Sequence, residues 1–321
     1  MSTIASGDFW AFVGVVAGIY TILALGLQLQ FGFAGLLNFG HVAFMAIGAY
    51  AMAILVVKEG WSTWLAAPLG VLAAAAFGVV LGLFTLRLRA DYFAIVTIAF
   101  SEIVRYVATN DDRLTGGSQG TINLAGAGEA TTYNADWERF QSWLQGALGL
   151  GSKDVAMLVV VWLAAVVLLT AVWLAVRTPW GRVLKAIRED EDAAASLGRN
   201  VFAYKLQALA LGSALAGVAG CFYAWQFSFF SPDDFAPLLT FFAWMIVILG
   251  GLGRVWSVPV GALAFGVLYA GTRFFDFVPF TWFESAERAY LRLLLIGLVI
   301  VLLVLFRPQG LLGKRQEMVL E

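Results

Sequence analysis

The sequence predicts an all-α integral membrane protein, a polytopic helical bundle with about nine transmembrane helices. Of its 321 residues, 61% are hydrophobic and only 13% are charged, whereas soluble domains carry about 25% charged residues. Apolar runs of about 20 residues, the length that crosses a bilayer, recur along the whole chain. We therefore treat residues 1–321 as one transmembrane domain.

The predicted spans are the nine longest apolar runs, and their boundaries are placed by length. They lie at roughly 9–30, 37–57, 62–84, 91–109, 154–176, 201–224, 236–253, 257–276 and 289–306. A tight turn at 31–35 separates the first two spans. The fourth span is the most polar, because Ser101, Glu102 and Arg105 interrupt its second half.

The basic residues predict the orientation of these spans. Most of the 20 Lys and Arg residues fall on one side of the nine-span arrangement, and the positive-inside rule places that side in the cytoplasm. The N-terminus is then outside, and the tail at 307–321 is cytoplasmic. The first apolar run is expected to be a retained span, because no basic region of a signal peptide precedes it. The net charge of −1 gives no indication of nucleic-acid binding.

The longest predicted extramembrane segment, 110–153, lies on the outer side. Its second half carries aromatic and aliphatic residues at helical spacing, namely Trp137, Phe140, Trp143 and Leu144. This pattern favours an amphipathic helix on the outer interface. The alternative is a helix that covers the bundle and has no role in ligand binding.

The segment 177–200 is a highly charged island between two apolar spans. Thr178 and Pro179 predict a helix start, with a hydroxyl cap and proline at the first helical position, and Gly198 predicts a helix end. Several apolar residues fall near one face at helical spacing: Val183, Ile187, Ala194 and Leu197. We interpret the segment as a short helical hairpin or bent helix that shows a partly apolar docking face to the cytosol.

Motifs of catalysis are absent from the sequence. It contains no P-loop, HExxH or GxSxG pattern. A single histidine, His41, and a single cysteine, Cys221, exclude a multi-histidine metal site and an internal disulfide. We therefore expect no enzyme activity, no metal site and no cofactor bound by this chain, with Cys221 as a small packing residue.

Polar residues inside the fourth span are candidates for function, because such residues are costly in a bilayer. Thr97, Ser101 and Arg105 follow at intervals of four and form one stripe. Glu102 and Arg105 are three residues apart and can pair. The stripe is expected to face the protein interior or a water-filled pathway. The alternative is an ion pair that only orients the helix at the outer interface.

The start of the second span also carries polar residues, Asn38 and His41. We consider both as pathway residues, although a lone histidine near a helix start is more often a structural donor. Gln28 and Gln30 are expected to be interfacial. The glycine-containing breaks at 38–41 and 250–253 have different flanks, so no internal repeat is evident, and an inverted repeat of the secondary-transporter kind stays open.

Six stretches together resemble the LivM-type permease subunit of bacterial branched-chain amino-acid ABC importers. They span nearly the whole chain, in order: 35–53, 86–105, 114–120, 181–201, 249–253 and 305–313. The resemblance implies a multi-pass protein of the bacterial inner membrane that works with a second homologous permease subunit. It also implies two cytoplasmic ABC ATPase subunits that use ATP. A periplasmic or lipid-anchored solute-binding protein is implied near the outer loop with Thr115, Gly116 and Gly117.

The resemblance also gives the charged island a role. Asp192–Gly198, DAAASLG, is similar to the EAA-type cytoplasmic loop of ABC importer permeases, with Asp for the usual Glu. In such importers this loop is a short cytoplasmic coupling helix that docks on the ATPase. The implied coupling residues are Arg182, Lys185, Arg188, Glu191, Asp192, Ala193, Ala194 and Gly198. The implied mechanism is alternating access driven through this helix.

Three alternatives remain at the level of sequence. Within the same class, the solute is urea, a short-chain amide or another amino acid. A stand-alone secondary transporter or channel would place acidic residues near mid-span, whereas the acids here cluster at span ends and in loops. A scaffold with no transport role leaves the polar stripe of the fourth span unexplained.

Overall fold

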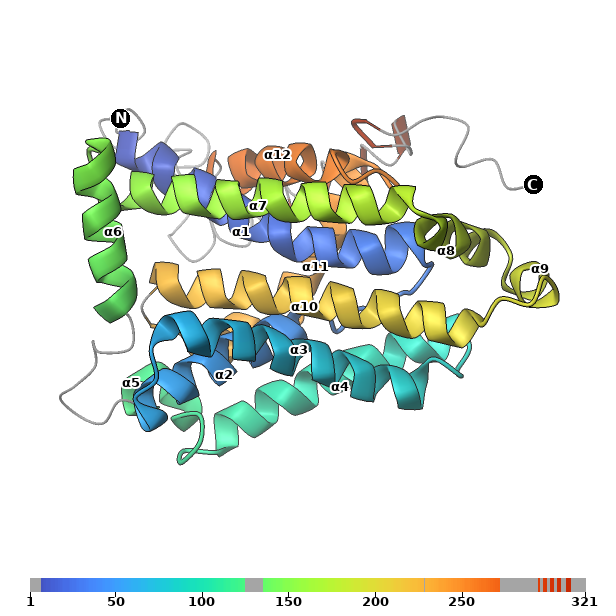
Figure 1. Ribbon diagram of the computed structural model, residues 1–321, viewed down its shortest axis with the longest axis horizontal. Helices are drawn as coiled ribbons and strands as arrows, with labels where there is room; N and C mark the ends of the chain where they lie inside the picture. Colours follow the sequence, from blue (N-terminus) through green and yellow to red (C-terminus); the bar gives the residue numbers. More distant parts are fainter. Residues whose placement is uncertain are drawn as a thin grey trace.

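A computed structural model describes residues 7–124, 135–227 and 229–271, together with a few separate positions between 294 and 312. Helices dominate this part of the chain, and no strand occurs in it (Figure 1). The main helices are α1 Gly7–Leu27, α2 Val42–Glu59, α3 Thr63–Thr85, α4 Ala90–Asn110, α6 Ala135–Leu148, α7 Lys153–Arg177, α8 Pro179–Glu189, α9 Glu191–Ser196, α10 Val201–Phe227, α11 Leu238–Gly250 and α12 Ser257–Gly271. Short elements complete the order: η1 Gln28–Phe33, η2 Gly117–Gln119, α5 Thr121–Leu124 and η4 Pro232–Phe235. The prediction of an all-α bundle is confirmed.

Seven helical segments in the described part are long and apolar enough to cross a membrane. They correspond to the first seven predicted spans, the seventh being η4 with α11 (Pro232–Gly250). The eighth predicted span is the shorter apolar helix α12. The ninth, 289–306, falls mostly outside the described residues, so the total of nine stays a prediction.

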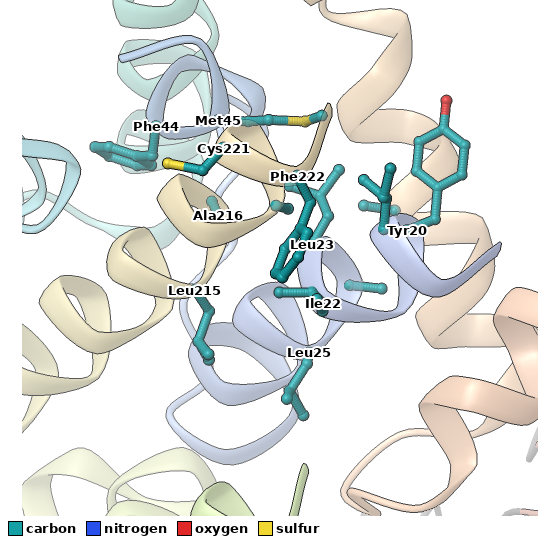
Figure 2. Packing of buried hydrophobic residues seen from close by; sticks show 14 of the residues in the cluster. Tyr20, Ile22, Leu23, Leu25, Phe44, Met45, Leu215, Ala216, Cys221 and Phe222 are labelled. Carbon is teal, nitrogen blue, oxygen red and sulfur yellow. The ribbon is translucent and has the colours of Figure 1, made fainter. Parts of the chain in front are cut away.

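Helix α1 is the central helix of the bundle, and α7, α10 and α12 pack around it (Figure 1). A helix that is apolar on all sides is expected to be buried on all sides. In the core, Ile22, Leu23 and Leu25 of α1 lie beside α10, which contributes Leu215 and Phe222 (Figure 2).

Small residues let α2, α3 and α10 approach closely, as the Gly- and Ala-rich sequence predicts. A Cβ atom at Gly48 of α2 would lie 2.6 Å from Gly217 of α10, and one at Gly220 would lie 2.0 Å from the Met45 carbonyl. Cys221 is buried in this contact, with Sγ 3.8 Å from the Gly48 carbonyl. Its predicted packing role is confirmed.

Helices α2 and α11 begin at the same level inside the bundle and run to opposite ends. The backbone N–H of Val42, at the start of α2, donates to Oγ1 of Thr240 in the first turn of α11 (3.0 Å). The far end of α2 leads to Ser62, which donates to Asp136 of α6 (2.9 Å). The far end of α11 lies by η1, where the Gly251 carbonyl accepts from Gln28 (3.2 Å). We call these the α6 end and the α8 end of the bundle.

Helices α2 and α11 make an inverted arrangement. Helix α1 runs to the α8 end, and the chain then turns back through residues 34–41 before α2 begins. Helix α10 runs to the α6 end, where Trp225 stacks on Trp137, and the chain turns back through 229–237 before α11 begins. The sequence comparison paired residues 38–41 with 250–253, which follow α11, and so did not detect this arrangement. The counterpart of residues 34–41 is the stretch 229–237, which precedes α11.

Helix α6 runs across the ends of the long helices (Figure 1). The predicted helix in 110–153 is thus confirmed. Trp137 is buried, with its ring stacked on Trp225 at 4.3 Å between centroids. Phe140 packs edge-on against Trp64, whereas Trp143 is 65% exposed. One side of the amphipathic helix thus covers the bundle, and the other side is open.

Candidate functional site

The central break, residues 34–41, joins η1 to α2 in the interior of the bundle. Asn38 is fully buried there and makes three hydrogen bonds that fix the break. Its Nδ2 donates to Oε1 of Gln30 (2.9 Å), its Oδ1 accepts from the N–H of Gly40 (2.9 Å), and its carbonyl accepts from the indole of Trp244 in α11 (3.1 Å). Interior polar groups at membrane depth need such partners within the protein.

Thr97 connects α4 to the same break. Its Oγ1 accepts from the N–H of Phe39 (3.1 Å) and donates to the Ala94 carbonyl (2.8 Å). The two backbones nearly touch, since a Cβ at Gly40 would lie 1.8 Å from the Thr97 carbonyl oxygen. The prediction that the polar stripe faces the interior is confirmed at Thr97 and at Ser101, which is 2% exposed.

His41, the residue before α2, is wedged between α1 and α10. Its Nε2 lies 3.1 Å from the Leu23 carbonyl, and Gly26 leaves the room for its ring. Its Nδ1 has no hydrogen-bond partner. The geometry is that of a structural contact, which was one of the two sequence interpretations of this residue.

The expectation that Gln28 and Gln30 are interfacial is wrong. Both are fully buried. Gln30 Nε2 donates to the Leu209 carbonyl of α10 (3.0 Å), and Gln28 Nε2 donates to the Arg254 carbonyl (3.0 Å). Proximity to a span end suggested an interface, but the glutamines instead tie η1 to the surrounding chain.

Arg105 ends the polar stripe near the α6 end of α4. It pairs with Glu102 at 2.8 Å, as predicted, and also with Asp233 of η4 at 3.0 Å. The second pair was not evident from sequence, because the two residues are 128 positions apart. This network ties α4 to the stretch that leads into α11.

The predicted outer-loop residues lie in a compact turn after α4. The Thr115 hydroxyl donates to the carbonyls of Ala108 (2.6 Å) and Asp111 (2.7 Å). Gly116 and Gly117 have φ values of +81° and +62°, which side-chain-bearing residues rarely adopt. The glycines are therefore explained by the backbone of the turn.

Helix α8 begins at Pro179, as predicted, but its cap is not the expected one. The Thr178 hydroxyl makes no cap hydrogen bond to α8. It donates instead to the Ala175 carbonyl of α7 (2.6 Å). Thr178 therefore closes the end of the preceding helix, and proline alone marks the start of α8.

Part of the apolar side of α8 faces the bundle, which corrects the predicted docking face at Ile187, whereas Val183 is partly exposed. Leu184 and Ile187 are at most 1% exposed. Leu184 belongs to a small apolar cluster with residues of the central break and of two helices: Ala34, Leu36, Phe93, Ala208 and Leu209. Arg188 adds a polar link, since its Nη1 donates to the Gly32 carbonyl (2.5 Å). The contact between the charged island and the central break is thus direct.

Helix α9 projects beyond the bundle at the α8 end (Figure 1). Asp190 caps it by accepting from the N–H of Ala193 (2.9 Å), and Gly198 ends it with φ +75°, as predicted. Ala194 is buried, but Leu197 is 82% exposed. Glu191 pairs with Lys205 of α10. Asp192 and Ala193 are exposed to solvent.

A cavity of about 280 Å³ separates α9 from the central break. Its walls come from the break, from the turn between α3 and α4, and from the Glu191–Lys205 pair; they include Gly35, Leu36, Leu37, Arg87, Arg89 and Phe93. Of the predicted coupling residues, Arg182, Lys185, Arg188, Glu191, Asp192 and Ala193 are exposed. They form a polar surface around the α8–α9 corner.

Two residues that build this site, Thr240 and Leu184, were not predicted from sequence, and Gln30 was assigned to the wrong environment. Leu184 carried a signal, because it lies three positions before Ile187 on α8. Gln30 and Thr240 carried none, since their roles depend on contacts across the fold. No group of three or more potential metal ligands occurs in the described residues.

Residues 10–304 match the family described as branched-chain amino acid transport system / permease component. The chain is 35% identical over 306 residues to the high-affinity branched-chain amino acid transport system permease protein LivM of Salmonella typhimurium, covering 94% of this chain and 69% of that relative. It is 26% identical over 337 residues to the probable LivM of Methanocaldococcus jannaschii, covering 93% and 91%. LivH of Escherichia coli is 24% identical over 321 residues, covering 94% of each chain. No solved structure shows significant similarity.

Proposed function

The chain belongs to the family of branched-chain amino acid transport permease components, and from this premise we propose how its geometry serves transport. It is a membrane permease subunit of a branched-chain amino-acid ABC importer. We propose that it forms half of the translocation pathway, that a second homologous permease forms the other half, and that two separate ATPase subunits drive it through α8 and α9.

The observation that carries this proposal is the contact between α8 and the central break. Leu184 shares an apolar cluster with the break residues Ala34 and Leu36. Arg188 bonds to Gly32 of η1 and lies against the break residue Gly35. A displacement of α8 therefore reaches the point from which α2 starts. Because Val42 and Thr240 join the starts of α2 and α11, both helices respond to the same displacement. Packed interfaces of this kind switch between discrete arrangements.

In the proposed mechanism, ATP is used by the partner subunits, and this chain binds no cofactor. Closure of the ATPase pair moves α8 and α9, and the central break transmits the shift to α2 and α11. Asn38, His41 and Thr97 act on the pathway by holding the break in place, because their buried side chains bond within the break or to the helices around it. Ser101 is buried on the same stripe of α4. Access alternates between the two sides of the membrane when α2 and α11 repack around the central break.

The proposed topology has nine spans, with the α8 end in the cytoplasm and the N-terminus outside. The excess of basic residues at that end supports this orientation. The α6 end then faces the solute-binding protein, which we propose to dock over the turn at 115–117 and the open side of α6. Multi-pass insertion in the inner membrane agrees with the seven long apolar helices.

Reconstitution tests the proposal directly. The tagged chain is purified in mild detergent, and the co-purifying proteins are identified. An ATPase and a second permease are expected. The complex is placed in liposomes with its solute-binding protein, and labelled leucine uptake is measured with ATP and with a non-hydrolysable analogue. Uptake only with ATP supports the proposal, whereas a chain that purifies alone and conducts leucine without ATP overturns it.

A competition panel separates the substrate classes. Unlabelled leucine, isoleucine and valine are expected to reduce labelled leucine uptake, whereas urea and acetamide are not. The reverse order would favour the alternative that the solute is urea or a short-chain amide. No described side chain decides between these solutes, so the panel is the deciding measurement.

A further inference from the structure

A second cavity, of about 510 Å³, lies on the side of the bundle at the α8 end. Four cationic side chains surround it: Arg177 at the end of α7, Arg182 and Lys185 on α8, and Arg254 before α12. Its size is within the range of about 300–1,000 Å³ that is typical of small-molecule sites. None of its lining residues belongs to the central break or lines the 280 Å³ cavity, so the two cavities are separate.

The four cations lack carboxylate partners within the described part of the chain. The ion pairs found there are Glu102–Arg105, Arg105–Asp233, Asp136–Arg139 and Glu191–Lys205. The cations contact neutral groups instead. Arg177 lies 3.6 Å above the centroid of the Trp173 ring, and Lys185 lies 5.6 Å from that of Phe33. A concave site with four positive charges that form no ion pair among the described residues attracts an anion.

The remaining lining is apolar and aromatic, with Val176, Val255 and Leu312 beside Trp173 and Trp256. Trp256 is 46% exposed. Tryptophan is enriched where a membrane protein crosses the lipid headgroup region, and Arg177 marks the last turn of the apolar helix α7. Cationic side chains next to apolar and aromatic ones are complementary to a ligand with an anionic headgroup and a hydrocarbon chain.

We propose that this cavity binds the headgroup of an anionic phospholipid, and that Arg177, Arg182, Lys185 and Arg254 hold its phosphate. The acyl chains then lie along α7 and the Trp256 side chain. Basic pockets between membrane helices are known to favour such headgroups. Under the proposed topology, this lipid belongs to the cytoplasmic leaflet and stabilises the junction between α7 and α8.

The experiment compares two triple variants of the full chain, purified with any subunits that accompany it. The cavity variant carries Arg177→Gln, Arg182→Gln and Arg254→Gln. The matched control carries Arg87→Gln, Arg89→Gln and Arg199→Gln, which remove the same charge at the same end but away from the cavity. Delipidated protein is titrated with phosphatidylglycerol or phosphatidylcholine of equal chain length, and native mass spectrometry reports the bound lipid.

The wild-type and control proteins are expected to bind phosphatidylglycerol more tightly than phosphatidylcholine. The cavity variant should lose at least about tenfold in affinity for phosphatidylglycerol, since each basic residue near an anionic lipid contributes about fivefold. If the triple variant does not fold, the Arg177→Gln/Arg254→Gln pair tests the same point without touching α8.

Three outcomes overturn the proposal. They are equal phosphatidylglycerol affinity in the cavity variant and the wild type, an equal loss in the control variant, and displacement of the lipid by millimolar inorganic phosphate, which indicates a site for free anions. The titration uses neither ATP nor amino acid. A failure of the lipid proposal is therefore distinguishable from a failure of the transport proposal.

Discussion

The central break and the α8–α9 corner both interrupt apolar helices with polar residues, but they satisfy those residues in opposite ways. In the break, the Asn38 side chain and the backbone groups around it bond to one another and to side chains of η1, α4 and α11 at 2.9–3.1 Å. On α9, Asp192 and its neighbours are open to solvent, and the cap Asp190 bonds only locally.

The difference shows which polar residues serve the subunit and which are available to a partner. A buried polar group that loses its hydrogen-bond partner costs about 1–3 kcal/mol, so the residues of the break determine stability. Exposed charges contribute little to folding. A change on α9 should therefore alter coupling to a partner and leave the fold intact.

The largest expected effect on stability comes from the contact between the break and α4. Gly40→Ala places a Cβ 1.8 Å from the Thr97 carbonyl oxygen. Overpacking costs about 1–3 kcal/mol when side chains can move, and here the obstacle is backbone, so we expect a loss of folded protein. The measurement is the yield of monodisperse protein in mild detergent.

The matched control for this prediction is Gly146→Ala in α6, where a Cβ atom meets nothing within 4 Å. Its yield should equal that of the wild type, and its melting temperature should be equal or slightly higher, because alanine favours a helix more than glycine does. If Gly40→Ala behaved in the same way, the break would not be as tightly held as the geometry indicates.

A smaller effect is expected from Thr97→Val, which keeps the shape and removes the hydroxyl. The N–H of Phe39 then loses its acceptor, and stability should fall by about 1–3 kcal/mol. Thr170→Val is the control, because that hydroxyl bonds only to its own helix. Thr97→Ser should restore the melting temperature; equal melting of Thr97→Val and the wild type would contradict the proposed role of this hydrogen bond.

Gly198→Ala tests the end of α9 with a smaller cost. Its φ of +75° costs a side-chain-bearing residue about 1–2 kcal/mol, although a Cβ there meets nothing within 4 Å. Gly60 has a φ of +66° and is equally open at the other end of the bundle. Both variants should lose similar stability, but only Gly198→Ala should reduce ATP-dependent leucine uptake. Equal uptake in the two would remove α9 from the coupling path.

The sequence was sufficient to predict the bundle because the spans follow from local chemistry. Apolar length sets each span, and the helix signals at Pro179 and Gly198 act within one turn. The Glu102–Arg105 pair was predictable for the same reason, since its members are neighbours on one helix.

What could not be predicted depends on contacts between distant residues. The burial of Gln30, the Thr240 contact with Val42 and the Arg105–Asp233 pair all join segments more than 100 positions apart. The orientation of α8 was misread because its apolar residues could equally cover the bundle or face a partner. Periodicity identifies an apolar face but does not say what covers it.

Asp192→Lys is the sharpest test of the comparison, because it should have the smallest effect on stability. The side chain is exposed and forms no ion pair among the described residues, and its place in the first turn of α9 makes the reversal cost about 0.3–1 kcal/mol. Glu191 is less suitable, because it pairs with Lys205 and its reversal would also disturb the subunit. Uptake should fall at least about tenfold, which corresponds to about 1.4 kcal/mol of lost coupling, while the melting temperature stays within a few degrees of the wild type.

Glu59→Lys, an exposed charge reversal at the other end of the bundle, is the control and should keep full uptake. If Asp192→Lys transported leucine at the wild-type rate, the exposed surface of α9 would not be the docking surface, and the link to the ATPase would have to run through α8 alone.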